Sequence, residues 1–234
     1  MSYQLSVISY QLSVISYKFL VRKIMKKSLL ISMLLMIILL VVSCNDTTPT
    51  MPVITTNNDS TGIWPMRVGY TWGYNISYYN SKDSIYKQDN DTWTIILDTM
   101  MESDKAYLVE SAQNKKNGIS PHPFFIKPDG VYGYPLDTFN IQLWYKYPAK
   151  QNEKYLFGND TIQVISINSS INVKAGKFNC IKYSSKRHYL NNSYDLDEDY
   201  FSPGLGKVFS RSTSYNNDTL VSKVEMELIN YHLK

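Results

Sequence analysis

Few residues in this chain combine a reactive side chain with the spacing that chemistry requires. The three histidines, His122, His188 and His232, lie far apart, and no two have the His-x-x-x-His spacing that holds a metal ion. His122 stands between two prolines, a pattern that indicates an irregular loop, and we expect all three histidines to be ordinary surface residues. The sequence therefore predicts no catalytic residue.

A hydrolase is the catalytic alternative. A Ser-His-Asp triad around His122 or His188 stays open, because the members of a triad come together only in the fold. No Gly-x-Ser-x-Gly nucleophile elbow occurs in the sequence, which removes one route to such an enzyme. The interpretation we favour is a protein that is not an enzyme and needs no cofactor.

The densest carboxylate cluster is the run Asp-Leu-Asp-Glu-Asp that begins at Asp195. In an extended chain Asp195, Asp197 and Asp199 lie on one side, and Ca²⁺ takes oxygen ligands of this kind. An EF-hand loop would need Gly and Glu at its sixth and twelfth positions, where this chain has Tyr200 and Gly206. We expect a solvated hairpin edge whose charges discourage association between sheets, with a Ca²⁺ site as the alternative and no metal predicted.

The chain is bounded at its start by segments that do not belong to a folded domain. Ser2–Ile8 recurs without change as Ser9–Ile15, which looks like translated tandem-repeat DNA, so residues 1–24 are interpreted as an upstream extension and Met25 as the initiator. Two lysines then precede an apolar run, residues 29–42, broken only by Ser32. This run is shorter than the roughly 20 residues that span a bilayer, and it fits the apolar core of a signal peptide.

The apolar run ends at Val41-Val42-Ser43-Cys44, which resembles the lipobox of bacterial lipoproteins. The resemblance implies cleavage of residues 25–43 as a signal peptide, a diacylglyceryl thioether on Cys44 and an acylated new amine. More than one acyl chain is what stable anchoring requires. The alternative is an uncleaved membrane anchor. The expected location is the bacterial cell envelope, at the outer membrane, with the membrane as a partner through the N-terminal lipid.

Cleavage at Cys44 changes the charge and the cysteine count. Five of the 24 basic residues and none of the 20 acidic ones precede Cys44, so the mature chain carries 19 basic against 20 acidic residues and has no basic field that would bind nucleic acid. Cys180 is left without a partner in the chain, and we expect it to be a small buried hydrophobe. A reactive thiol is the minor alternative, because no neighbour that would lower its pKa is evident.

Residues 44–62 are polar and lack periodicity, as in a flexible tether, and residues 63–234 carry the signals of one β domain. Trp72, Tyr74, Ile76 and Tyr78 alternate, as one face of a strand should. Turn sequences such as Asn117-Gly118, which suits a type I′ hairpin, punctuate the rest. Strands are expected at 71–80, 92–100, 106–111, 131–134, 141–147, 161–167, 170–174, 178–185, 198–202, 206–213 and 219–231. Short strands at this spacing indicate a sandwich, barrel or curved sheet.

Three segments together resemble uncharacterised exported lipoproteins of Bacteroidota-like bacteria: Trp64–Trp72, Val173–Cys180 and Tyr200–Val208. Their order and spacing agree with that family, although Lys174 stands where a Pro is usual. The pattern of such proteins is similar to the half-open β-sheets of lipoprotein-localisation factors. The resemblance implies an all-β fold made of a single antiparallel, strongly curved sheet or an open or half barrel, with a concave face able to hold an acyl chain.

The activity we expect is therefore binding, on an aromatic-rich concave face. One class is a carrier of a hydrophobic small molecule or lipid, which needs a deep apolar cavity of ~300 Å³ or more. The other is an envelope scaffold that recognises a glycan or a protein partner on a shallow face of exposed rings. Tyr also serves as a strand former with its hydroxyl in water. The aromatic residues we expect to contact a ligand are Trp72, Tyr74, Trp93, Trp144 and Tyr147.

Lipidation is testable by detergent-phase partitioning of cells that express the wild type, Cys44→Ser or Cys180→Ser. We expect the wild type and Cys180→Ser to be processed and to enter the detergent phase, because each carries the acylated Cys44. Cys44→Ser should stay at precursor size. Processing and partitioning of Cys44→Ser like the wild type would contradict the prediction.

Overall fold

The residues described in the computed structural model form one antiparallel sheet with almost no helix, which confirms the predicted fold class. They are residues 62–101, 103–135, 140–189 and 191–233, and they belong to the second of the two units, 1–53 and 54–234, into which the chain divides. Cys44 and almost all of the predicted leader and tether lie outside the described residues. The strands are β1 (Thr71–Tyr79), β2 (Ile85–Met101), β3 (Asp104–Ser111), β4 (His122–Lys127), β5 (Gly130–Gly133), β6 (Gln142–Lys146), β7 (Lys154–Phe157), β8 (Asp160–Val173), β9 (Gly176–His188), β10 (Ser193–Ser202), β11 (Gly206–Asn216) and β12 (Thr219–His232), and the helix is α2 (Ala112–Lys116).

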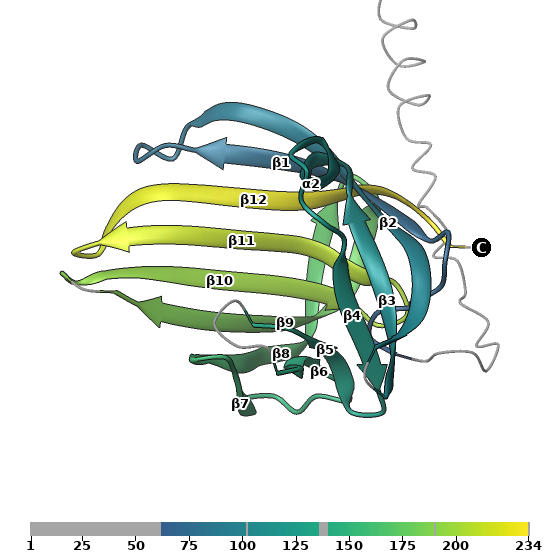
Figure 1. Ribbon diagram of the computed structural model, residues 1–234. Helices are drawn as coiled ribbons and strands as arrows, with labels where there is room; N and C mark the ends of the chain where they lie inside the picture. Colours follow the sequence, from purple (N-terminus) through teal and green to yellow (C-terminus); the bar gives the residue numbers. More distant parts are fainter. Residues whose placement is uncertain (1–61, 102, 136–139, 190, 234) are drawn as a thin grey trace, which may run out of the picture. The chain divides into compact units, whose positions relative to one another are not determined.

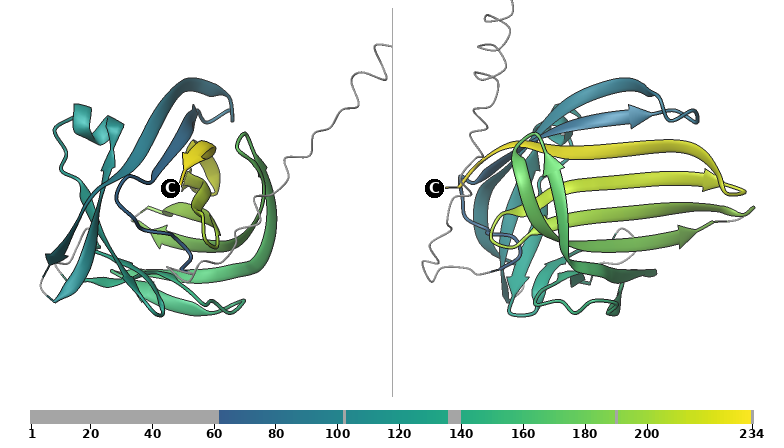
Figure 2. Two further views of the ribbon diagram at one scale, coloured as in Figure 1. Left: turned by 90° about the vertical axis from the view of Figure 1, so that its right-hand side faces the viewer. Right: turned by 180° about the vertical axis from the view of Figure 1, so that it is seen from behind.

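The sheet consists of two meanders joined at the ends of the domain. Its order is β6-β5-β4-β3-β2-β1-β12-β11-β10-β9-β8-β7, so β1 pairs with β12 and the two edges come from the middle of the chain. Figure 1 shows β9 to β12 running side by side across the view, with β3 and β4 at a steep angle to them. The views of Figure 2 show the same sheet curling until it is nearly closed into a barrel.

The remaining seam lies between β6 and β7, where side chains take the place of a backbone ladder. The Trp144 and Phe157 rings stack with centroids 4.9 Å apart. The Tyr155 hydroxyl donates to the carbonyl of Trp144 at 2.9 Å and accepts from the amide of Lys146 at 3.2 Å. Tyr155 thus satisfies polar groups that an edge strand would otherwise expose.

Bulges and tight turns give the sheet its curvature. The register shifts between Gly73 and Tyr74 in the β1–β12 ladder and between Tyr200 and Phe201 in the β10–β11 ladder. Each bulge bends its strand and increases the local twist. The turn between β11 and β12 has Asn217 and Asp218 both at positive φ, as a type I′ hairpin requires.

The predicted hairpin at Asn117-Gly118 is wrong. Asn117 has a φ of −90° and ends α2, while only Gly118 has positive φ, at 71°. Asn and Gly are favoured at helix C-termini as well as in type I′ turns. Here Ser111 starts the helix by accepting a hydrogen bond from the amide of Asn114 at 3.1 Å.

Three strands also differ from the expectation. The Pro-His-Pro segment is not a loop, because β4 begins at His122 and Pro123 lies opposite Leu108 of β3. The pairing of β5 with β4 begins only at Phe125, so Pro123 has a ladder on one side and its missing N–H is tolerated. Strand β7 was not predicted, and β8 is one long strand with bulges where the sequence suggested two strands.

The core is densest around Trp64, which comes from the segment before β1. Trp64 is fully buried, and its ring lies 5.8 Å from Trp72, 5.1 Å from Phe124 and 5.6 Å from Phe201. The chain passes close to the indole at Gly206, where an added Cβ would lie 2.3 Å from Trp64 Cδ1. Gly206 therefore permits both this approach and its φ of 103°.

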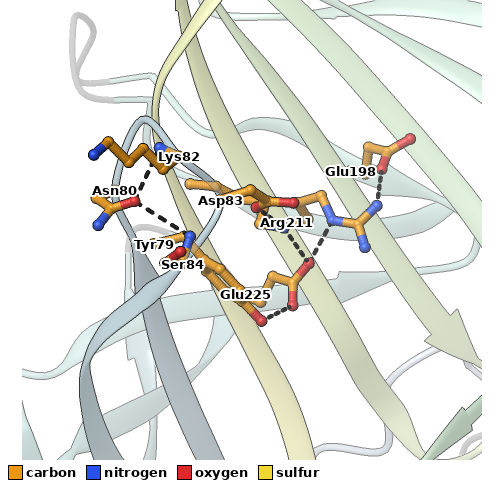
Figure 3. Close-up of polar contacts among 9 residues, drawn as sticks. Tyr79, Asn80, Lys82, Asp83, Ser84, Glu198, Arg211 and Glu225 are labelled. Carbon is orange, nitrogen blue, oxygen red and sulfur yellow. Dashed lines mark hydrogen bonds and ion pairs between the residues drawn. The ribbon is translucent and has the colours of Figure 1, made fainter.

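Charged residues on the opposite face of the sheet from Phe201 pair across neighbouring strands (Figure 3). Arg211 Nε donates to Glu225 at 2.8 Å, and its Nη1 lies 3.4 Å from Glu198. The Tyr79 hydroxyl donates to the second oxygen of Glu225 at 2.7 Å. Burial would raise the pKa of Glu225, but the hydrogen bonds from Tyr79 and Arg211 outweigh it and lower the pKa. The network joins β10, β11, β12 and β1 from outside.

Substitution of Gly206 by Ala should destabilise the domain by about 3 kcal/mol, because Ala there combines positive φ with overpacking against Trp64. Gly118→Ala is the matched control: Gly118 also has positive φ, but an added Cβ would meet nothing within 4 Å. Its cost should be about 1 kcal/mol. Urea unfolding followed by tryptophan fluorescence measures both values, and equal costs would contradict the role of Trp64.

Glu225→Gln should lower stability at neutral pH by about 1 kcal/mol or less, since solvent screens the half-exposed network. Because the folded pKa is lowered, the stability that Glu225 provides is present above the unfolded pKa and is lost as pH falls through the folded pKa. Urea unfolding of the variant and the wild type should therefore converge at acidic pH. Glu110→Gln, which removes only a surface pair with Lys115, is the control. A pH-independent difference would argue against the charge network.

Candidate functional site

The barrel holds an open cavity of about 1030 Å³ on its inner side. One end of the cavity is aromatic, with Trp144, Tyr145, Phe157 and Tyr183 in its wall. The opposite wall comes from β10, β11 and β12 and is polar before it turns apolar at Val224 and Met226. The inward side chains of that wall are Asp197, Asp199, Lys207, Ser210, Ser212, Val224 and Met226. Arg211 also borders the cavity, but its guanidinium pairs with Glu198 and Glu225 of the outer network.

The aromatic end is a continuous stack of rings. The Trp144 ring stacks on Tyr145, with centroids 5.5 Å apart, as well as on Phe157. The Tyr145 ring centroid lies 4.2 Å from that of Phe201 in the core. The Tyr183 hydroxyl donates to the carbonyl of Lys146 at 2.6 Å. Burial raises the pKa of both Tyr145 and Tyr183, so these phenols stay neutral hydrogen-bonding groups. This end of the cavity offers an apolar surface with few free polar atoms.

Strand register arranges the polar wall in rows. Asp197 lies directly opposite Ser185 on β9 and Ser212 on β11. In the next row toward the core, Asp199 lies opposite Tyr183 and Ser210. Side chains that are opposite across a sheet are about 5 Å apart on the same face. The wall thus changes from hydroxyl and carboxylate groups to rings over two rows.

An ion pair closes the bottom of the polar wall. Lys207 Nζ lies 2.9 Å from Asp199, and the Tyr145 hydroxyl donates to the other oxygen of Asp199 at 2.8 Å. The ammonium is also 5.7, 5.5 and 5.6 Å from the ring centroids of Trp93, Tyr145 and Phe201. A buried charge needs a partner of this kind, and both charges of the pair are engaged within the protein.

A second ion pair lies higher in the cavity. Arg187 donates to Asp160 through Nε, at 2.9 Å from Oδ2, and also through Nη2. Hydrogen bonding to Asp160 is the main cause that raises the pKa of Arg187. A fork-shaped pair of this geometry is among the stronger charge-assisted contacts, so Arg187 is held by the protein itself.

Asp197 differs from these carboxylates, because no Lys, Arg or His nitrogen of the described chain lies within 4 Å of it. Burial raises its pKa, a hydrogen bond from Ser212 lowers it, the charges of Asp199 and Asp195 raise it further, and the more distant charge of Arg187 lowers it. The net shift is upward, as expected for a carboxylate whose charge is poorly compensated.

The acidic run is therefore not a solvated hairpin edge, and that expectation is wrong. Strand β10 lies between β9 and β11, and the alternation that places Asp197 and Asp199 on one side turns them into the cavity. Glu198 points to the outer network instead. Within the described residues, no group of three or more His, Cys, Asp and Glu side chains is arranged to hold a metal ion.

His122 is not an ordinary surface residue either. It is half-buried in the cavity wall, 4.8 Å from the Phe124 ring and 5.7 Å from Trp144. Burial lowers its pKa, and Nε2 has no hydrogen-bond partner in the described structure. His188 is exposed near the mouth, 5.8 Å from the Tyr194 ring, and His232 is exposed at the end of β12.

The five predicted ligand-contacting aromatics are not brought together. Trp72 and Tyr74 are fully buried and donate to the carbonyls of Leu205 and Lys207, which makes them core residues. The Trp93 indole donates to the buried Asp91 at 2.9 Å. Of the five, Trp144 lines the large cavity, and Tyr147 lines a smaller hollow of about 430 Å³ beside Ile63 and Pro148.

Sequence reasoning missed the serines of the polar wall. Ser185, Ser210 and Ser212 occur in polar stretches that alternate with other polar residues, so hydropathy gives no sign of which side faces inward. Pairing with Asp197 and Asp199 would have identified them, but register is not readable from the sequence. The prediction for Cys180 is confirmed: the thiol is buried, and burial raises its pKa to about 12.

A search of the described part of the chain finds no helix long and apolar enough to cross a membrane.

Comparison with known proteins yields structural neighbours but no family. No protein-family model and no curated protein match the sequence. A candidate exported protein with a YmcC-like fold from Bacteroides fragilis is 16% identical, with a TM-score of 0.37 over 73% of this chain and 98% of its own. A candidate lipoprotein from Parabacteroides distasonis is 13% identical, with a TM-score of 0.39 over 74% of this chain and 100% of its own. The function has to be argued from the residues of this chain.

Proposed function

We propose that this chain is a lipid-anchored protein of the bacterial cell envelope, at the outer membrane, whose β domain binds an amphipathic small molecule or lipid without catalysing a reaction. The observation that carries the proposal is the open cavity of about 1030 Å³ inside the barrel. Pockets for small molecules usually measure about 300–1,000 Å³. The lipobox at Cys44 supplies the anchor, and the membrane is the partner that the anchor implies.

The two ends of the cavity support an amphipathic ligand rather than a purely apolar one. Trp144, Tyr145 and Phe157 provide flat apolar surface at one end, where an acyl chain or a ring would displace water. Asp197, Ser210 and Ser212 would be left without water or partners by a wholly apolar ligand, and buried polar groups are costly when unpaired. A ligand with an apolar body and a polar group satisfies both ends.

The non-catalytic part of the proposal rests on the histidines. A triad requires a hydroxyl and a carboxylate in hydrogen-bond contact with one imidazole. The His122 ring instead faces Phe124 and Trp144, and its Nε2 lacks a partner in the described structure. This surrounding favours a packing role for His122 over proton transfer.

A recognition scaffold for a glycan or protein partner is the second candidate. The Tyr194 and Tyr215 rings stack with centroids 4.9 Å apart near the start of β10 and the end of β11. Lys186 Nζ lies 3.6 Å from the Tyr194 ring centroid. Both tyrosines are partly exposed, which is the kind of surface that a sugar ring could cover. The cavity favours the carrier, because a scaffold that binds through stacked surface tyrosines does not require a cavity.

Native mass spectrometry of the full-length protein purified from its own membranes tests the proposal. We expect a copurifying small molecule on the wild type and its loss from Ser212→Phe, which replaces a hydroxyl of the cavity wall with a phenyl group. Ser170→Phe adds the same group at an exposed position of β8 and should keep the ligand. A wild type that carries no small molecule, or a molecule that Ser212→Phe retains, would contradict cavity binding and leave the scaffold.

A further inference from the structure

We infer that the ligand carries a primary amine, and that its ammonium group binds Asp197 between Ser185 and Ser212. This inference rests on the proposed function, since it names the chemistry of the ligand that the cavity takes. Every carboxylate in the cavity wall except Asp197 is paired with a cation of the protein.

Because the other carboxylates of the cavity wall form ion pairs, Asp197 is the one that remains to accept a ligand's hydrogen bonds. Asp199 is held by Lys207 and Tyr145, and Asp160 is held by Arg187. Arg187 lies on β9 opposite Asp195, two residues along from the partner of Asp197, and its charge lowers the pKa of Asp197, but its guanidinium is held by Asp160. The remaining neighbours on its own strand, Asp195 and Asp199, are both negative, which increases the need for a positive partner.

The row around Asp197 matches the three donors of an ammonium. A primary ammonium has three N–H groups and no acceptor. The carboxylate of Asp197 with the hydroxyls of Ser185 and Ser212, one on each side across the strands, provides three acceptors on one face. Ser212 already donates to Asp197, and its oxygen remains free to accept.

The protein itself holds an ammonium in this way one level deeper. Lys207 Nζ pairs with Asp199 at 2.9 Å and has aromatic rings on several sides. Ring faces are negative and attract cations. An amine at Asp197 would repeat this arrangement one row closer to the mouth, with its apolar body directed at Trp144 and Phe157 across the cavity.

An anionic ligand is the competing expectation, and the same geometry opposes it. Four cations line the cavity. Lys207 and Arg187 are engaged by Asp199 and Asp160, Arg211 pairs with Glu198 and Glu225, and Lys186 Nζ lies 3.6 Å from the Tyr194 ring centroid. A carboxylate or phosphate would have to break one of these pairs while lying beside Asp197.

Three probes of similar size and different charge test the inference on the full-length protein in lipid nanodiscs. They are 2-phenylethylamine, 3-phenylpropanoate and 2-phenylethanol, which are cationic, anionic and neutral at neutral pH and share a benzyl body. Binding is followed by saturation-transfer difference NMR, with Ser212→Phe giving the background from nanodiscs. We expect the amine to bind at least about tenfold more tightly than the acid, as one charge-assisted hydrogen-bond site would give.

Asp197→Asn should weaken the binding of 2-phenylethylamine by about tenfold or more. It should change the affinity for 2-phenylethanol by less than about twofold. The variant should fold, since it keeps a hydrogen-bond acceptor for Ser212 and removes a carboxylate whose pKa is raised by burial; its thermal unfolding checks this. Asp195→Asn, on the same strand and side but outside the cavity lining, is the matched control and should bind the amine like the wild type.

The outcomes separate the two claims. Equal binding of all three probes, or an amine affinity that Asp197→Asn does not change, overturns the amine inference and leaves the proposed carrier. Preference for the acid overturns it as well and assigns the site to Lys207 or Arg187. No probe binding above the Ser212→Phe background, together with no copurifying molecule on the wild type, overturns the proposed function itself.

Discussion

The structure depends on how the interior of a twelve-stranded sheet is filled. A sheet that curls this far encloses more space than the side chains of its own strands occupy, and protein interiors are close-packed. Trp64 fills the enclosed space at one end of the barrel. It enters from the segment before β1 and contacts rings from β1, β2, β4 and β10 at once. Nothing comparable in the described chain fills the other end, and the cavity lies there.

The strands carry this division along their length. On β10 the inward positions run from Asp197 through Asp199 to Phe201, and on β9 from Ser185 through Tyr183 to Ile181. The inward face is therefore polar where water has access and apolar where Trp64 packs. Because β9 to β12 are long, one strand can serve both the core and the cavity. Some side chains serve both regions: Tyr145 packs against Phe201 in the core and also lines the cavity.

Sequence patterns predicted the class of fold better than the site. Alternation in β1 and the Asn-rich turns were enough to indicate short antiparallel strands, and the curved single sheet followed from the resemblance of three segments. The five aromatics do not gather at the cavity, because large rings are favoured both in cores and in binding sites. Trp72 and Tyr74 are fully buried, and Trp72 packs against Trp64. Burial depends on the fold, and a single sequence does not supply the register that decides it.

The carboxylates of β10 show why the wall of the cavity is not simply a weak part of the core. Glu198 lies on the outer face and is compensated by Lys182 of β9 and Arg211 of β11. Asp199 is compensated by Lys207 inside the barrel. An uncompensated Asp197 in the same strand lowers the stability of the free protein, since its raised pKa means that the folded state resists the charge. Replacement of Asp197 by a neutral residue of similar size would remove that cost. Asp197 is unfavourable in the free protein and would become favourable with a cation beside it. A binding site requires such a group, because the gain in free energy appears only in the complex.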